Sequence, residues 1–168
     1  MTPCPSALED GEMRDVSTSK NQPVVAAGSK AEAGELQQAR EQLEPLDARA
    51  RLLWAYERFG SGFALTTSFG IQSSVLLHVL SGMDRGRDIP VIWVDTGYLP
   101  PETYRYAEDL CQRFGLNLHI AQSSSSAARM EALHGRLWES GVVEDMELYL
   151  KIRKVEPLEA AMHRLQVS

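Results

Sequence analysis

Apolar residues recur at two different spacings along residues 45–134, and the two spacings alternate. Helical spacing runs through Leu53 and Trp54 and stops at Gly60 and Gly62, after which residues 63–68 form a short apolar and β-branched run typical of a strand. The alternation continues with a helix at 73–80, a strand at 90–94, a helix at 101–114, a strand at 116–121 and a helix through Met130 and Leu133. The pattern therefore predicts three successive strand–helix units.

Strand–helix units with short connections predict an α/β fold, in which an open, mainly parallel sheet is flanked by helices. Ligands of such sheets bind beyond the carboxyl ends of the strands. The loops at 68–74, 95–99 and 122–126 should accordingly lie along one rim, where we expect the chemistry of the protein. One of the four serines at 123–126 is expected to cap the helix that follows.

The start of the chain differs in composition from the rest. Residues 1–48 carry four basic and nine acidic side chains, which is most of the formal net charge of −6, and all twelve aromatic residues lie at or beyond Trp54. A segment so poor in large apolar side chains cannot build a core. We therefore predict a polar, largely disordered leader over 1–44, with a possible helix at 31–43, and a folded domain over 45–168.

Composition also argues against several functions. The sequence has no run of eighteen apolar residues and no apolar stretch behind its acidic first fifteen residues, so we expect neither a membrane span nor a secretory signal, and the default compartment is the cytoplasm. No basic patch with interleaved aromatic residues is present, which argues against a nucleic-acid polymer as ligand. The four histidines lack metal-ligand spacing, and no metal site is predicted.

The loop over 68–74, with the sequence Ser-Phe-Gly-Ile-Gln-Ser-Ser, joins a strand to the start of a helix. Backbone N–H groups, the positive end of a helix dipole and serine hydroxyls would suit a phosphate or a sulfate there. The loop matches neither a Walker A motif nor a Gly-x-Gly-x-x-Gly turn. An ordinary strand–helix turn with serine caps explains these residues equally well.

Four segments of the chain carry a resemblance to a known family. They read Ala-Leu-Thr-Thr-Ser-Phe-Gly-Ile-Gln-Ser-Ser-Val (64–75), Ile-Pro-Val-Ile-Trp-Val-Asp-Thr-Gly-Tyr-Leu-Pro-Pro-Glu-Thr-Tyr-Arg (89–105), Ala-Arg-Met-Glu-Ala-Leu-His-Gly-Arg-Leu-Trp-Glu (128–139) and Ile-Arg-Lys-Val-Glu-Pro-Leu (152–158). In this order they resemble the assimilatory phosphoadenylyl-sulfate reductases, which belong to the adenine-nucleotide hydrolase-like PP-loop domains. The resemblance covers roughly residues 45–168 and implies a nucleotide-binding domain that reduces 3′-phosphoadenosine 5′-phosphosulfate (PAPS) to sulfite and adenosine 3′,5′-bisphosphate.

The resemblance also implies which residues bind the substrate. They are Ser68, Phe69, Gly70, Ile71, Gln72 and Ser73 in the first loop, Val94, Asp95, Thr96 and Gly97 at the end of the second strand, and the cationic pair Arg153 and Lys154. Lys154 is the first choice for contacting the phosphosulfate. A solvated pair before a helix that begins near Pro157 is the alternative for these two cations, and Asp95 could either hold its turn or face the ligand.

Departures from related patterns narrow the expected chemistry. ATP-cleaving PP-loop members carry Ser-Gly-Gly-x-Asp-Ser, where this chain has Phe69 and Gln72 in place of the first glycine and the aspartate, so magnesium-dependent ATP cleavage is not expected. Adenylyl-sulfate reductases carry a Cys-Cys pair for an iron–sulfur cluster where this chain has Tyr149 and Leu150. The resemblance therefore favours the phosphoadenylyl-sulfate type, with no bound cofactor and no iron–sulfur cluster.

The family's nucleophile is a cysteine in a Glu-Cys-Gly-Leu-His segment, and this sequence ends at Ser168 without one, so we expect a chain truncated before its catalytic residue. Cys4 lies in the leader and Cys111 lies on the apolar side of a helix, where an inert thiol is expected. Two hypotheses remain: the nucleotide half of a reductase, or a catalytically inactive nucleotide-binding remnant. The implied partners are PAPS, thioredoxin or glutaredoxin as reductant, and a possible homodimer.

Overall fold

The computed structural model describes residues 30–167, with side chains from residue 34 onward. The leader predicted as disordered lies mostly outside the described residues. Helix α1 spans Lys30–Leu43, in the segment where a helix was expected at 31–43. Contacts divide the chain between Gln38 and Ala39, and the three described strands lie in the second unit.

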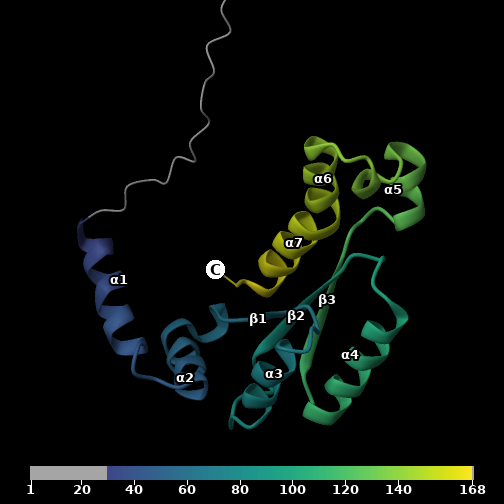
Figure 1. Cartoon of the computed structure of the whole chain (residues 1–168). Coiled ribbons are helices and arrows are strands. Elements are labelled where there is room, and N and C mark those ends of the chain that lie inside the picture. The colour runs from purple at the N-terminus through teal and green to yellow at the C-terminus, as the bar shows by residue number, and fades with distance from the viewer. Residues whose placement is uncertain (1–29, 168) are drawn as a thin grey trace, which may run out of the picture. The chain divides into compact units, whose positions relative to one another are not determined.

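The second unit follows the predicted order of strands and helices (Figure 1). Its elements are α2 (Ala48–Phe59), η1 (Gly60–Gly62), β1 (Leu65–Thr67), α3 (Ser73–Ser81), β2 (Pro90–Asp95), α4 (Pro101–Phe114), β3 (Asn117–Gln122), α5 (Ala127–His134), η2 (Leu137–Glu139), α6 (Val143–Leu150), η3 (Lys151–Val155) and α7 (Glu156–Leu165). Several predicted ends are reproduced: α4 begins at Pro101 and ends with a left-handed Gly115, and the Ser126 hydroxyl caps α5 by accepting from the Arg129 N–H.

The sheet has the order β1-β2-β3 and both of its pairings are parallel, which confirms the predicted α/β architecture. Trp93 of β2 lies opposite Thr67 of β1 and Ile120 of β3. Since side chains alternate along a strand, Val91 and Trp93 face one side of the sheet and Ile92 and Val94 the other. Strand β2 is thus covered on both faces, as its continuous apolar run predicts.

Each face of the sheet has its own core. Helices α3 and α4 pack on the Val91 side, where the buried cluster comprises Leu52, Phe69, Leu77, Leu80, Met83, Ile89, Val91, Trp93, Ala107 and Leu110. Helix α7 packs on the other side, where Ala161 meets Ile92 and Ala121 (Figure 1). Leu80, Ile89 and Val91 are completely inaccessible to solvent. Each such side chain contributes about 1.5–3 kcal/mol by burial, so these cores hold the sheet together.

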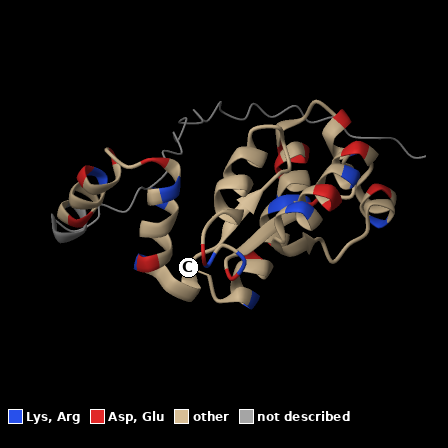
Figure 2. Cartoon of the chain, turned by 90° about the horizontal axis from the view of Figure 1, so that it is seen from below, with Lys and Arg blue, Asp and Glu red and all other residues tan. Residues whose placement is uncertain are grey.

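Charged residues play a smaller part in stability. Acidic and basic side chains are interspersed over the helices (Figure 2). The ion pairs Arg85–Asp88 and Arg136–Glu139 join residues three apart, and their side chains are more than half exposed. Exposed pairs of this kind contribute at most about 1 kcal/mol each.

Two elements differ from the sequence prediction. Strand β1 is limited to Leu65–Thr67 instead of 63–68, because Phe63 closes the η1 turn by donating to the Gly60 carbonyl and the Thr67 hydroxyl accepts from the Phe69 N–H. The helix expected to begin near Pro157 is preceded without a break by η3, a π-helical turn, and by α6. Pro157 cannot donate to the carbonyl four residues earlier and crowds it, and a π turn before the proline accommodates this.

Gly86 gives a test of how tightly the turn before β2 is packed. A Cβ at this position would overlap the carbonyl oxygen of Leu80. We expect Gly86→Ala to lower the free energy of unfolding by about 1–3 kcal/mol, because the backbone must move to admit a methyl group. Urea unfolding measures this change. Gly82→Ala is the matched control, since its Cβ would meet its nearest neighbour at 3.6 Å, an ordinary contact; equal losses in both variants would contradict the prediction.

Candidate functional site

The predicted rim is present at the carboxyl ends of the three parallel strands. Two cavities lie there. The first, here called the β1 cavity, has a volume of about 430 Å³ and is lined by Thr66, Thr67, Ser68, Ser73, Ile92, Val94, Lys154, Val155 and Leu158. The second, the β3 cavity, has a volume of about 360 Å³ and is lined by Asp95, Gly97, Gln122, Ser123, Ser124, Ser125, Ser126, Ala127 and Arg153. All three predicted loops contribute to one cavity or the other.

The loop after β1 is anchored by its aromatic residue. Phe69 adopts a left-handed conformation with φ 53°, is buried, and packs edge-on against Trp93 with ring centroids 5.0 Å apart. Its neighbour Ile71 points outward and is 88% exposed. Anchoring Phe69 in the core lets the flanking residues Ser68 and Ser73 line the β1 cavity.

Helix α3 begins at this cavity with its N-terminal N–H groups uncapped by a side chain. Gln72 occupies the N-cap position and its side chain makes no capping hydrogen bond. Ser73, the first residue of α3, lines the cavity. The Ser73 N–H donates to the Gly70 carbonyl, and the helix dipole favours an anion near the N–H groups of the first turn.

Asp95 holds the end of β2. Its carboxylate accepts hydrogen bonds from the Gly97 N–H at 2.8 Å, the Tyr104 hydroxyl at 2.7 Å and the Gln122 amide at 2.7 Å. Burial by itself would raise the pKa of this carboxyl, but the bonds from Gln122, Tyr104 and Gly97, with the positive charge of Arg153, outweigh burial and lower its pKa. Of the two roles considered for Asp95, the geometry shows the turn-holding one.

Arg153 and Lys154 face different cavities, although the sequence presents them as one cationic pair. Arg153 is only 4% exposed and lines the β3 cavity, where its guanidinium donates to the carbonyl oxygens of Thr96 and Ser125. Lys154 is exposed and lines the β1 cavity with Ser68 and Ser73. The alternative of a solvated pair is therefore wrong for Arg153. The side chains of consecutive residues in a helix point about 100° apart. The sequence therefore already indicated that Arg153 and Lys154 would point in different directions.

Sequence reasoning missed several residues of the site, or the role that they play in it. Thr66 and Leu158 line the β1 cavity, and Tyr104 and Gln122 hold the Asp95 carboxylate. The strand register could have revealed Gln122, because it lies directly opposite Asp95 in the β2–β3 pairing. Leu158 comes from α7, whose packing against the sheet no local pattern shows.

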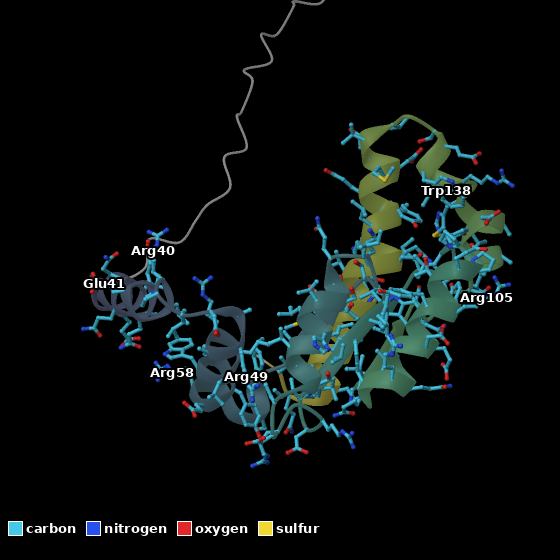
Figure 3. All side chains as sticks on the ribbon, turned by 60° about the horizontal axis from the view of Figure 1, so that its bottom comes forward. Arg40, Glu41, Arg49, Arg58, Arg105 and Trp138 are labelled. Carbon is cyan, nitrogen blue, oxygen red and sulfur yellow. The ribbon has the colours of Figure 1, made fainter. Side chains whose placement is uncertain are left out.

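A cluster of aromatic side chains packs around Tyr98, in the loop that follows β2. Tyr98 packs against Trp138 with ring centroids 4.5 Å apart, and both contact Tyr149 of α6. Trp138 belongs to η2 and is labelled in Figure 3. The Tyr98 hydroxyl donates to Glu131 of α5 at 2.9 Å. Burial, followed by this bond to a carboxylate, raises the pKa of Tyr98, so the phenol stays neutral. The cluster joins α5, η2 and α6 to the loop beyond β2.

Other chemistry-bearing features lie away from the rim or are weak. Cys111 of α4 is half-buried, and burial followed by the charge of Glu108 raises its pKa, which disfavours a reactive thiolate.

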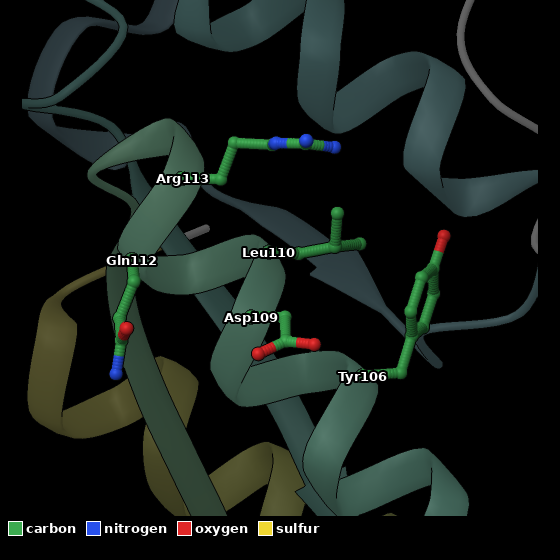
Figure 4. Close-up of a pocket in the computed structure, with 5 residues that line it drawn as sticks. All are labelled: Tyr106, Asp109, Leu110, Gln112 and Arg113. Atoms are coloured by element: carbon green, nitrogen blue, oxygen red, sulfur yellow. The ribbon is translucent and has the colours of Figure 1, made fainter.

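A hollow of about 610 Å³ along α4 is lined by Tyr106, Asp109, Leu110, Gln112 and Arg113, all from the later turns of one helix (Figure 4). Among residues 34–167, no three His, Cys, Asp or Glu side chains group as metal ligands. Within the described part of the chain, no helix has the length and apolar character needed to cross a membrane.

Comparisons with known proteins agree on one family. A model of the phosphoadenosine phosphosulfate reductase domain matches residues 62–168. A phosphoadenosine 5′-phosphosulfate reductase of Synechococcus sp. is 55% identical over 124 residues, which cover 74% of this chain and 53% of that protein. The corresponding protein of Alkalilimnicola ehrlichii is 46% identical over 144 residues, covering 86% of this chain and 55% of the relative.

A solved structure gives the same result. The phosphoadenylyl-sulfate reductase of Candida auris, determined as a phosphate complex, superposes with a TM-score of 0.69 at 28% identity, covering 80% of this chain and 64% of that one. The chain spans about half the length of the curated relatives it matches. The parallel sheet, the resembling segments at its rim and these matches together show that the chain belongs to the phosphoadenosine phosphosulfate reductase domain family.

Proposed function

We propose that this chain binds PAPS at the carboxyl rim of its sheet and serves as the nucleotide-binding part of a phosphoadenylyl-sulfate reductase. The observation that carries the proposal is the β1 cavity, where Lys154, Ser68 and Ser73 surround the start of α3. A lysine ammonium, two hydroxyls and an uncapped helix N-terminus are complementary to a phosphosulfate anion. The related reductase of Candida auris was solved with phosphate, which supports an oxyanion as ligand of this fold.

The β1 cavity also has apolar walls suited to the rest of a nucleotide. Ile92, Val94 and Leu158 line it beside the polar groups. Binding sites for small molecules commonly combine an apolar lining with a few placed polar groups, and a purine offers the flat apolar surface that such a lining covers. We therefore place the phosphosulfate at the Lys154 end and the adenosine against the apolar wall.

The proposed reaction reduces the sulfuryl group by two electrons. The S–O bond to the phosphate oxygen breaks, sulfite and adenosine 3′,5′-bisphosphate leave, and a dithiol reductant of the thioredoxin or glutaredoxin class becomes a disulfide. The described residues of this chain bind and orient the anion in that scheme.

Gln72, in place of a carboxylate, leaves the loop without a magnesium ligand, so we propose no metal-assisted step and no ATP cleavage. We further propose cytoplasmic localisation and no bound iron–sulfur cluster, since Tyr149 of the aromatic cluster and Leu150 stand where a cysteine pair would be needed.

A second candidate function is nucleotide binding without turnover. The half-buried Cys111 thiol, with its raised pKa, favours this alternative because it is a poor nucleophile and lies on α4. Both candidates require nucleotide binding, and only the reductase requires sulfite formation.

Two measurements on the full chain test these functions. Calorimetric titration with adenosine 3′,5′-bisphosphate should show saturable binding, because the product keeps the anionic groups that the rim accommodates. Incubation with PAPS and reduced thioredoxin measures sulfite release. Sulfite formed in proportion to the protein would exclude the second candidate, and titration without a binding heat at several temperatures would contradict both.

Lys154 is the residue whose removal should weaken binding most directly. We expect Lys154→Met to raise the dissociation constant of adenosine 3′,5′-bisphosphate roughly ten- to hundredfold, the equivalent of about 1.5–3 kcal/mol for a hydrogen bond to a charged group. Lys151→Met is the matched control: Lys151 is an exposed lysine of the same π turn and lies 4.0 Å from Glu156. Equal affinities of the two variants would remove Lys154 from the site.

The Asp95 carboxylate should make the stability of the rim depend on pH. A lowered folded-state pKa stabilises the fold fully above the ordinary carboxyl pKa of about 3.9, and this contribution is lost as the pH falls through the folded value. We expect Asp95→Asn to lower the free energy of unfolding by about 1–3 kcal/mol near neutral pH, because its NH2 group would replace one accepting oxygen and oppose either the Gln122 amide or the Tyr104 hydroxyl and the Gly97 N–H. Urea unfolding should show this difference shrinking below about pH 4. The exposed Asp109→Asn serves as control, and a pH-independent difference for Asp95→Asn would contradict the prediction.

A further inference from the structure

Arg153 is the one buried basic residue in the described part of the chain. The residues beside it in the sequence do not account for its burial. It lies in the π turn η3, between α6 and α7. Its Nε donates to the Thr96 carbonyl at 2.7 Å, one terminal nitrogen donates to the same oxygen, and the other donates to the Ser125 carbonyl at 2.5 Å. A single side chain thus joins the loop after β2 to the loop after β3.

The contact with Thr96 completes the restraint of one peptide plane. The Thr96 carbonyl and the Gly97 N–H belong to the same peptide unit. Arg153 donates to that carbonyl, and the N–H on the opposite edge donates to the Asp95 carboxylate. The unit is therefore fixed on both edges by oppositely charged groups, which sets the direction of the chain as it leaves β2.

Gly97 permits this arrangement in two ways. Its φ of +78° is a conformation that side chains rarely adopt, and a Cβ there would lie 2.7 Å from a terminal nitrogen of Arg153. The guanidinium also lies over the Tyr98 ring, with its carbon 5.5 Å from the ring centroid. The backbone and the aromatic cluster are thus both shaped around the arginine.

We propose that Arg153 is a positioning residue that acts on the nucleotide site without contacting the nucleotide: it locks the loops after β2 and β3 together and thereby fixes the π turn that presents Lys154 to the β1 cavity. The proposal rests on the proposed function, since it concerns the same site. The Arg153 guanidinium donates its hydrogen bonds to backbone carbonyls of the two loops. Lys154, one residue later, lines the β1 cavity and makes no ion pair within residues 34–167. The direction of Lys154 follows from the anchoring of Arg153, because adjacent residues of a helical turn are rotated together.

Arginine is required for this role by geometry. Its planar fork reaches two carbonyls in fixed directions, whereas a lysine ammonium is a single point charge on a flexible stem. Arg153→Lys therefore keeps the charge and removes the two-loop bridge, which makes it the diagnostic substitution. Arg164→Lys is the matched control, because Arg164 is an exposed arginine in the last turn of α7.

Hydrogen exchange of the ligand-free protein tests the lock directly. In Arg153→Lys we expect two amides to exchange at least tenfold faster than in the unaltered chain: that of Gly97 in the loop after β2, and that of Arg129 in the first turn of α5, which donates to the Ser126 hydroxyl at the end of the loop after β3. The Ser73 amide, which donates to the Gly70 carbonyl in the separate loop after β1, should be unchanged. Unchanged exchange at Gly97 and Arg129 would overturn the proposal, and so would acceleration at all three amides, which would indicate a general loss of stability.

A measurement on the unaltered protein covers the case in which Arg153→Lys does not fold. The Nε–H of Arg153 donates to a buried carbonyl, so its nitrogen–proton NMR signal should be resolved and protected from solvent exchange, unlike that of Arg164. Equal exchange of the two signals would overturn the proposal without any substitution.

A double-mutant cycle with adenosine 3′,5′-bisphosphate tests the coupling to Lys154. If Arg153 acts by presenting Lys154, the tenfold or greater loss caused by Lys154→Met should shrink to about twofold or less in the Arg153→Lys background. Additive losses would overturn the coupling. Absence of binding by the unaltered chain would overturn the proposed function, and with it the role in the nucleotide site, whereas the exchange and NMR results still decide whether Arg153 locks the two loops.

Discussion

The hydrogen bonds that converge just beyond the end of β2 organise the part of the rim formed by the loops after β2 and β3. Asp95 brings together the turn at Gly97, the helix α4 through Tyr104 and the strand β3 through Gln122. Arg153 adds the loop after β3 and the α6–α7 helical segment. A buried carboxylate and a buried guanidinium are each costly to desolvate, and both are tolerated here because each carboxylate oxygen and each guanidinium nitrogen has at least one hydrogen-bond partner. Five elements are thus tied to one point of the chain.

This arrangement separates rigid support from ligand contact. The β3 cavity holds the internally bonded groups, Asp95 and Arg153, while the β1 cavity holds an exposed lysine, two serines and an uncapped helix start. The Arg153 guanidinium already donates to backbone carbonyls and is less able to bind an anion, whereas the Lys154 ammonium is available to bind one. The site proposed for the phosphosulfate is for this reason on the side of the rim where Lys154 makes no ion pair with any described residue.

The loop after β1 shows how a neutral sequence is held in place beside the proposed anion site. Phe69 in place of a glycine costs strain in the left-handed region, which its burial against Trp93 offsets. The buried Phe69 ring holds the loop against the core, so that the start of α3 and the residues Ser68 and Ser73 face the β1 cavity. Phe69 stands here in place of the first glycine and Gln72 in place of the carboxylate of the ATP-cleaving pattern, which suits the proposed binding of an anion without a metal.

The sequence by itself determined the order of strands and helices, the parallel sheet, the rim and the family. Those features follow from local periodicity, from caps such as Gly115 and Ser126, and from the segments at the strand ends, all of which are written in neighbouring residues. Only the tertiary structure decided that Arg153 and Lys154 face different cavities and that Asp95 serves the turn. These outcomes depend on contacts with residues such as Thr96, 57 positions away from Arg153, and on a π turn that rotates the helix just before Pro157. Because such long-range contacts set the direction of each side chain, adjacent residues with the same charge acquired different roles.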